Sequence, residues 1–209
     1  MTQALEQLFI QAFPALDTQA QQQGLQLYQQ LAKGKAISVT ELAKLWSLTE
    51  THTKELLDSW TGVAFDQDQA IKGFWGVDTE ATSHCFYLND TQLYTWCAWD
   101  LLFMPHIYKQ TIKASTVCPI SGQTIQLSIS EQGIETVSPA GAMITFIEPE
   151  LSALKANVTQ SFCQYIFFVA SEAEGEQWKS KQENGFLMSM HDGFELGKKI
   201  IQTIFKDRQ

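Results

Sequence analysis

The sequence has little positive charge and no stretch typical of export or membrane insertion. Its 209 residues include 14 lysines and arginines against 23 aspartates and glutamates, which gives a net charge of -9. Such a chain repels the phosphates of nucleic acids and of anionic lipids. Residues 1–13 carry no basic cluster, and no stretch approaches the ~20 consecutive apolar residues of a transmembrane helix. We therefore expect a cytoplasmic protein with neither nucleic acid nor membrane among its partners.

Cysteine is also scarce, and its spacing excludes two common uses. The four cysteines are Cys85, Cys97, Cys118 and Cys163. They form no CxxC pair, which argues against a structural zinc site, and they are too widely separated for a disulfide framework. In a reducing cytoplasm these thiols are expected to remain free.

The first third of the chain is predicted to be helical. Apolar residues recur at helical spacing ahead of Pro14 and again ahead of Gly34. Ser38 and Glu41 form a capping box, which predicts a helix that runs to about Trp46.

A second capped helix and a short hairpin complete this region. The helix is expected to begin after Ser47 or Thr49, and the hairpin pairs residues 63–65 with residues 71–75. Two helices followed by a hairpin resemble a winged helix, which suggests DNA. However, residues 50–60 offer one lysine against three acidic side chains, a balance that disfavours phosphate binding. We interpret the region as a structural lobe.

Beyond about residue 80, strands alternate with helices. Four β-prone segments are bounded by Gly, Pro, Asn or Ser: Phe86–Leu88, Gln126–Ser130, Met143–Ile147 and Phe162–Val169. The last is apolar on both faces, so it is predicted to be a central strand. A closing helix is expected from Asp192 onward. The predicted fold class is α+β, with a helical winged-helix-like lobe (1–78) and a mixed, mainly antiparallel sheet domain with flanking helices (79–209).

Residues 93–105, LYTWCAWDLLFMP, are apolar on nearly every side and predict a buried helix ended by Pro105. In such a helix Cys97 and Asp100 lie side by side on one face. A buried carboxylate is costly unless it is paired or protonated. The pair is therefore either catalytic, or a core cysteine beside an aspartate that bonds the backbone. Cys163 is open to the same two interpretations.

Several short motifs occur in order along most of the chain from residue 73 to residue 197. They are GFWG at 73–76, His84, LYTWCAWD at 93–100, Pro105, Ser115 with Cys118, SPAG at 138–141, SFC at 161–163 and HDGFELG at 191–197. Together these motifs resemble the organomercurial lyase (alkylmercury lyase) family. The resemblance implies a winged-helix-like lobe followed by an α+β catalytic domain that cleaves carbon-mercury bonds.

Position by position, the resemblance implies that Cys97 and Cys163 bind mercury and that Asp100 transfers the proton. The Hg(II) product is expected to stay on the two thiols, with an Asp100 oxygen as a further ligand. Cys118 matches a cysteine that serves structure in the family, so it is assigned no catalytic role.

Other positions carry weaker signals. Trp99 stands where the family commonly has a smaller aliphatic residue, and Gln164 stands where some relatives have a second cysteine. His84, beside Cys85, is interpreted as a residue of strand packing rather than a metal ligand. His191 is interpreted as a terminal or capping residue of the last helix.

The chemistry of mercury agrees with this set of residues. Hg(II) is a soft cation that prefers thiolate ligands, and two thiolates on R-Hg(II) weaken the bond between mercury and carbon. Asp100 could take a proton from a thiol as a base and deliver it to the carbon as an acid. Burial favours this by raising the carboxyl pKa above its usual ~3.9.

The predicted function is therefore protonolysis of alkyl- and arylmercury compounds, which gives a hydrocarbon and Hg(II). No organic cofactor is required, and an external thiol or a partner mercuric reductase is expected to remove the product. Two alternatives stay open on the residues alone. One is a non-catalytic thiol-based heavy-metal carrier, and the other is a metal-responsive transcription factor.

Overall fold

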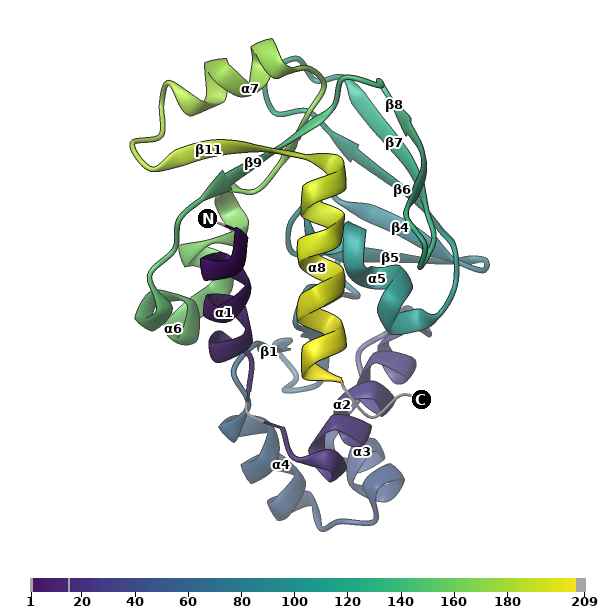
Figure 1. Cartoon of the computed structure of the whole chain (residues 1–209). Coiled ribbons are helices and arrows are strands. Elements are labelled where there is room, and N and C mark those ends of the chain that lie inside the picture. Colours follow the sequence, from purple (N-terminus) through teal and green to yellow (C-terminus); the bar gives the residue numbers. More distant parts are fainter. Residues whose placement is uncertain (1, 15, 206–209) are drawn as a thin grey trace.

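Two antiparallel sheets and their flanking helices organise the computed structural model, which describes residues 2–14 and 16–205 (Figure 1). The eight-stranded sheet has the order β1-β2-β3-β5-β4-β6-β7-β8 and the three-stranded sheet the order β10-β9-β11. The predicted α+β class with mainly antiparallel sheets is confirmed. The strands are β1 (Val63–Phe65), β2 (Ile71–Phe74), β3 (Val77–Asp78), β4 (Cys85–Leu88), β5 (Thr91–Thr95), β6 (Ile112–Val117), β7 (Thr124–Ile129), β8 (Ile134–Ser138), β9 (Met143–Ile147), β10 (Phe168–Val169) and β11 (Gly185–Ser189).

The helices of the first third form where capping signals predict them. Glu41 N–H donates to the Ser38 hydroxyl, and Ser38 N–H donates to the Glu41 carboxylate, so both halves of the capping box are present. Thr49 caps the next helix by accepting from His52 N–H. The hairpin of β1 and β2 follows, as predicted. The four helices are α1 (Thr2–Ala12), α2 (Thr18–Leu31), α3 (Val39–Trp46) and α4 (Glu50–Ser59).

Helix α1 lies apart from α2, α3 and α4. It contacts α6 (Leu151–Ser161) and α8 (Met190–Ile204), and Figure 1 shows it beside these two helices. Its Phe9 ring packs against Trp99 and Phe162, with ring centroids 5.0 and 4.8 Å apart. The first helix thus places an aromatic side chain, Phe9, against residues that are distant in the sequence.

The prediction of a helix over residues 93–105 is wrong about both the start and the end of that helix. Leu93 and Tyr94 belong to strand β5, and the helix α5 begins only at Asp100 and continues through Pro105 to Tyr108. An apolar run that is buried on every side does not by itself distinguish a strand from a helix. Every residue of α5 from Asp100 to Ile107 is buried, so packing holds a helix that lacks the backbone donor at Pro105.

The central strand predicted over Phe162–Val169 is also wrong. This segment follows α6 as a 3-10 turn (η1, Cys163–Tyr165), and only β10 at its end is extended. β10 lies at an edge of the smaller sheet, paired with β9. The side chains on both faces are apolar because the irregular segment is buried, which periodicity could not separate from a buried strand.

The remaining predicted elements are confirmed, and α8 closes the structure against α5. Strands β4, β7 and β9 match the other three β-prone segments, and α8 matches the closing helix. The one helix not yet described, α7 (Glu172–Lys179), contacts β9 and β11. In the part of the chain that the structure describes, no helix has both the length and the apolar character needed to cross a bilayer.

Candidate active site

Cys97 and Asp100 meet in the turn between β5 and α5. The backbone N–H of Cys97 donates to Asp100 Oδ2 at 2.9 Å, and the Thr95 hydroxyl donates to the Cys97 carbonyl at 2.8 Å. A carboxylate in the first turn of a helix commonly accepts a bond from an N–H just before that turn. The prediction that thiol and carboxylate lie together is therefore confirmed, although a turn and not a helix face joins them.

Cys163 reaches the same place from the other side, on the 3-10 turn after α6. The two sulfur atoms and a carboxylate oxygen of Asp100 all lie within 4.8 Å of one another. Their side chains are buried, with exposed fractions of 0% for Cys97, 6% for Asp100 and 4% for Cys163. Within residues 2–14 and 16–205, no other group of three Cys, His, Asp or Glu side chains is arranged to hold a metal ion.

Burial sets the electrostatics of these three groups. It raises the pKa of Asp100 to about 7, against the opposing effect of the bond from Cys97 N–H. Burial likewise raises the pKa of the Cys97 thiol well above its usual range. At Cys163 the hydrogen bond with Cys97 lowers the pKa, but burial and the charge of Asp100 outweigh that bond and raise it overall. The unloaded site therefore favours protonated thiols and a carboxyl group that exchanges its proton near neutral pH.

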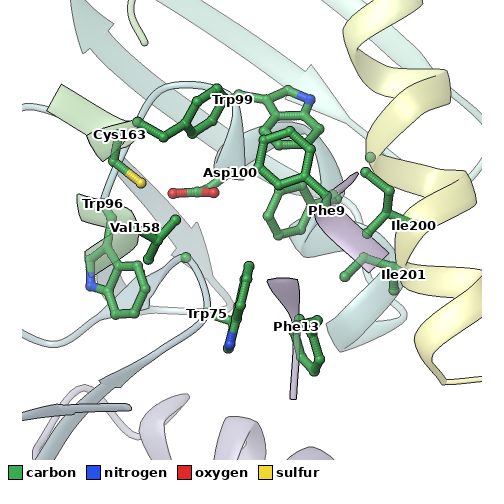
Figure 2. Close-up of a pocket in the computed structure, with 14 residues that line it drawn as sticks. Phe9, Phe13, Trp75, Trp96, Trp99, Asp100, Val158, Cys163, Ile200 and Ile201 are labelled. Carbon is green, nitrogen blue, oxygen red and sulfur yellow. The ribbon is translucent and has the colours of Figure 1, made fainter. Parts of the chain in front are cut away.

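An apolar cavity opens onto Cys163 and Asp100, and Figure 2 shows the Cys163 sulfur pointing toward the Asp100 carboxylate. The cavity is narrow, since the centre of a water-sized sphere has about 30 Å³ of space in it. Of the residues that line it, Asp100 and Cys163 have ionisable side chains, whereas Cys97 is not among the lining residues. The other walls are Phe9, Phe13, Trp75, Gly76, Trp96, Trp99, Phe103, Val158, Phe162, Gly197, Ile200 and Ile201.

Gly76 gives Asp100 its room. This glycine has φ = 95°, and a Cβ atom built on it would lie 2.9 Å from Asp100 Cγ. Any larger residue would combine a strained backbone with a clash against the carboxylate. The second glycine of the GFWG motif thus shapes the site.

Two further residues that the sequence singled out serve packing. The His84 imidazole is buried and bonds Thr116 Oγ1 at 2.7 Å, and burial lowers its pKa to about 4. That agrees with its interpretation as a residue of strand packing. Cys118 donates to Glu174 on α7 at 3.3 Å.

The other marked positions lie in different surroundings. Cys85 is half-buried in β4, and His191 is exposed in the first turn of α8. Gln164 is exposed and donates to the Gln160 carbonyl. Trp99 lines the cavity, and its indole N–H donates to the Gly193 carbonyl at 2.8 Å.

Sequence reasoning missed the walls that α1, α6 and α8 supply. The walls in question are Phe9 of α1 with Phe13 directly after it, Val158 of α6, and Ile200 with Ile201 of α8. Amphipathic spacing marks such residues as core, but it does not show which part of the core is hollow. Trp75 had a better signal, because it stands inside the GFWG motif.

Comparison with known proteins finds one family. Residues 78–202 match the family model described as MerB, alkylmercury lyase. An alkylmercury lyase of Bacillus cereus is 28% identical over 173 residues, which are 82% of this chain and 77% of the relative, and one of Streptomyces lividans is 26% identical over 178 residues, 85% and 81% of the two chains. The crystal structure of the mercury-bound form of MerB2 superposes with a TM-score of 0.73 at 17% identity, over 83% of this chain and 85% of that one. Because the family model matches more than half of the sequence, this chain belongs to the alkylmercury lyase family and is an enzyme that cleaves the carbon-mercury bond of organomercurials.

Proposed function

We propose that Cys97 and Cys163 bind the mercury of the substrate and that Asp100 carries the proton to carbon. The observation that supports this assignment is the buried group of two sulfurs and one carboxylate oxygen within 4.8 Å of one another. One metal ion could contact all three atoms. Hg(II) as substrate and product suits two thiolates, with an Asp100 oxygen as a weaker third ligand.

The first step is thiol exchange at Cys163, because this residue lines the cavity whereas Cys97 does not. The Cys163 sulfur bonds to mercury, and the thiol that accompanied R-Hg(II) leaves with the Cys163 proton. Cys97 then gives its proton to the Asp100 carboxylate, and its thiolate binds the same mercury as a second donor.

The second step breaks the carbon-mercury bond. Protonated Asp100 delivers its proton to the carbon, the electrons of the carbon-mercury bond form the new C–H bond, and R–H leaves. Mercury remains as Hg(II) on Cys97 and Cys163. A pKa of about 7 suits a carboxyl group that must be both base and acid at neutral pH.

The organic group occupies the apolar cavity beside the thiols. Aromatic and aliphatic side chains surround it, so alkyl and aryl groups gain by leaving water there. No organic cofactor is required for this chemistry. Two molecules of an external thiol can remove Hg(II) and return both protons to the cysteines, and a mercuric reductase is the proposed partner that receives it.

We also propose a division of the chain into two parts and a cellular location for it. Residues 1–78 form a winged-helix-like lobe and residues 79–209 a catalytic domain, in a cytoplasmic protein that binds neither nucleic acid nor membrane. The hairpin after α3 and α4 supports the winged-helix likeness. The acidic side chains of α4 support a role other than DNA binding.

The direct test is incubation with phenylmercury and excess thiol, with benzene and bound mercury measured on one sample. We expect benzene from the parent and from Cys85→Ser, which alters a half-buried cysteine of β4. We expect none from Cys163→Ser. Mercury binding without any benzene from the parent would support a carrier instead, and would overturn the assigned chemistry.

A further inference from the structure

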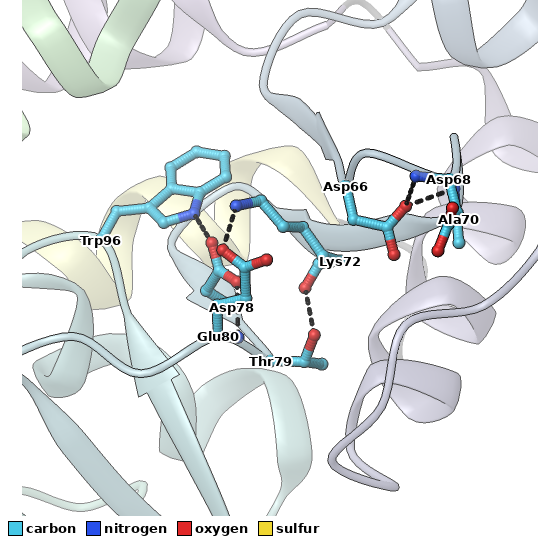
Figure 3. Close-up of polar contacts among 8 residues, drawn as sticks. All are labelled: Asp66, Asp68, Ala70, Lys72, Asp78, Thr79, Glu80 and Trp96. Atoms are coloured by element: carbon cyan, nitrogen blue, oxygen red, sulfur yellow. Dashed lines mark hydrogen bonds and ion pairs between the residues drawn. The ribbon is translucent and has the colours of Figure 1, made fainter.

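A second buried carboxylate lies beside the site and takes no part in the proposed chemistry. Asp78 ends strand β3, and its side chain is 5% exposed. Its Oδ2 accepts a hydrogen bond from the Trp96 indole at 3.0 Å, and its Oδ1 accepts from Glu80 N–H at 2.8 Å (Figure 3). The nearby cation, Lys72, is paired with Glu80. Burying a carboxylate is costly, so each of its bonds matters to where it lies.

The indole that Asp78 holds belongs to the residue directly before Cys97. Trp96 lines the cavity, and its backbone N–H donates to the Gly76 carbonyl at 3.0 Å. The tryptophan is therefore held at two points, one on its backbone and one on its ring. Figure 2 shows the indole on the same side of the cavity as Cys163 and Val158.

The first glycine of the GFWG motif makes room for this pair. A Cβ atom on Gly73 would lie 3.2 Å from both Trp96 Nε1 and Asp78 Oδ2, and 2.7 Å from the Val77 carbonyl oxygen. The motif thus has a glycine at each end for a different purpose. Gly73 accommodates the bond between Trp96 and Asp78, and Gly76 accommodates Asp100.

We propose that Asp78 is a positioning residue for carbon-mercury cleavage, which holds the Trp96 indole in place as a wall for the organic group. The inference rests on the proposed use of the cavity. Trp96 is only half-buried, so without an acceptor its ring could turn toward solvent. A wall fixed in advance lowers the entropic cost of binding, and the effect grows with the size of the group that touches it. Loss of the Asp78 side chain should therefore raise KM for phenylmercury more than KM for methylmercury.

The test compares Asp78→Ala and Asp78→Asn with a matched control. Asp66 is also an aspartate that accepts backbone bonds, from Asp68 and Ala70, but it lies in the β1–β2 turn, apart from Asp78 and Trp96 (Figure 3), and does not line the cavity. We expect Asp78→Ala to raise KM for phenylmercury by roughly 10-fold, the scale of one lost hydrogen bond to a charged group, with little change in kcat. Asp78→Asn has a single acceptor oxygen for two donors, the Trp96 indole and Glu80 N–H, so it should restore only part of the loss. Asp66→Ala should leave KM at its parent value.

Trp96→Phe completes a double-mutant cycle, because it removes the indole N–H and keeps a ring. It should raise KM for phenylmercury as Asp78→Ala does, and adding Asp78→Ala to it should have no further effect. This variant also tests the bond if Asp78→Ala fails to fold. Equal losses for phenyl- and methylmercury, or additive effects in the cycle, would overturn the inference.

The proposed function is tested by separate assays run in parallel. Benzene release by the parent, together with its loss in Asp100→Asn, tests the catalytic assignment. If those two results hold while Asp78→Ala keeps the parent KM, the positioning role alone is wrong. If Asp100→Asn is as active as the parent, the catalytic assignment is wrong whatever Asp78 does.

Discussion

The backbone N–H of Cys97 donates a 2.9 Å hydrogen bond to the carboxylate of Asp100. This bond ties the proposed proton carrier, Asp100, to the backbone of Cys97, the proposed mercury ligand, so the two groups keep their spacing before substrate arrives. Because the bond uses a backbone donor, it survives changes of the cysteine side chain. Substitutions at either position can therefore separate mercury binding from proton transfer.

Asp100→Asn should bind mercury and lose turnover. The amide can still accept the bond from Cys97 N–H, so we expect the variant to fold, but it cannot pass a proton as a carboxyl group does. Benzene release from phenylmercury should fall by ~100-fold or more, the usual scale for losing a positioned acid or base. Bound mercury on the same sample should match the parent. Turnover within a few-fold of the parent would assign the proton to another group.

The two active-site cysteines should differ when each is changed alone. Cys97→Ser and Cys163→Ser should each abolish turnover, since a hydroxyl is a poor ligand for Hg(II). Cys97→Ser keeps the thiol that lines the cavity, so it should capture phenylmercury as fast as the parent in stopped-flow measurements. Capture by Cys163→Ser should be slower. The reverse order would place the first exchange at Cys97.

Cys118→Ser, which removes the contact with Glu174, should lower stability more than turnover.

Asp100 should make stability fall as pH rises. Burial raises its pKa to about 7, whereas an unfolded aspartate titrates near ~3.9, so the folded state favours the protonated form. The free energy of unfolding should therefore decrease from about pH 4 to about pH 7, by at most about 4 kcal/mol, and level off above. Urea unfolding of parent and Asp100→Asn gives this contribution as a difference.

The comparison between the two proteins is needed because a histidine acts in the opposite direction. Burial lowers the pKa of His84 to about 4, which makes stability rise with pH over the same range. That effect is common to parent and variant and cancels in the difference. A difference that stays constant from about pH 4 to about pH 8 would mean that Asp100 titrates normally in the folded protein.

Gly76→Ala should impair catalysis because its Cβ meets Asp100. The matched control is Gly122→Ala, where φ is also positive (73°, against 95° at Gly76) but nothing lies within 4 Å of the added atom. Both variants bear the backbone strain of about 1 kcal/mol, yet only Gly76→Ala should also lower kcat, by roughly 10- to 100-fold. Similar kcat values for the two would mean that the clash is relieved without moving the carboxylate.

Phe9→Ala should show that α1 supports the cavity. The Phe9 ring is 3% exposed and packs on Trp99 and Phe162, so its removal should cost roughly 3 kcal/mol of unfolding free energy and raise KM for phenylmercury. Gln7→Ala, an exposed position of the same helix, should change neither the unfolding free energy nor KM.

Removal of residues 1 to about 75 should damage solubility and turnover, without affecting any DNA interaction.

Local signals in the sequence were sufficient for the first third of the chain. Ser38 with Glu41, and Thr49, begin α3 and α4 where the capping rules place them. Such signals depend on neighbours a few residues apart, so no tertiary information is needed. The closing helix α8 is recognisable for the same reason, from its amphipathic spacing.

By itself the sequence determined which side chains can bind mercury or transfer a proton. The tertiary structure decided how these side chains come together. The two thiols and Asp100 can be identified from the ordered motifs. However, the helix predicted through Cys97 and the strand predicted through Cys163 are both wrong. Both segments are buried on every side, and burial removes the periodicity by which helices and strands are told apart. Long-range packing sets their conformation. It also brings Phe9 of α1 to the cavity and the Trp96 indole to Asp78, contacts between residues too distant in sequence for any local pattern to predict.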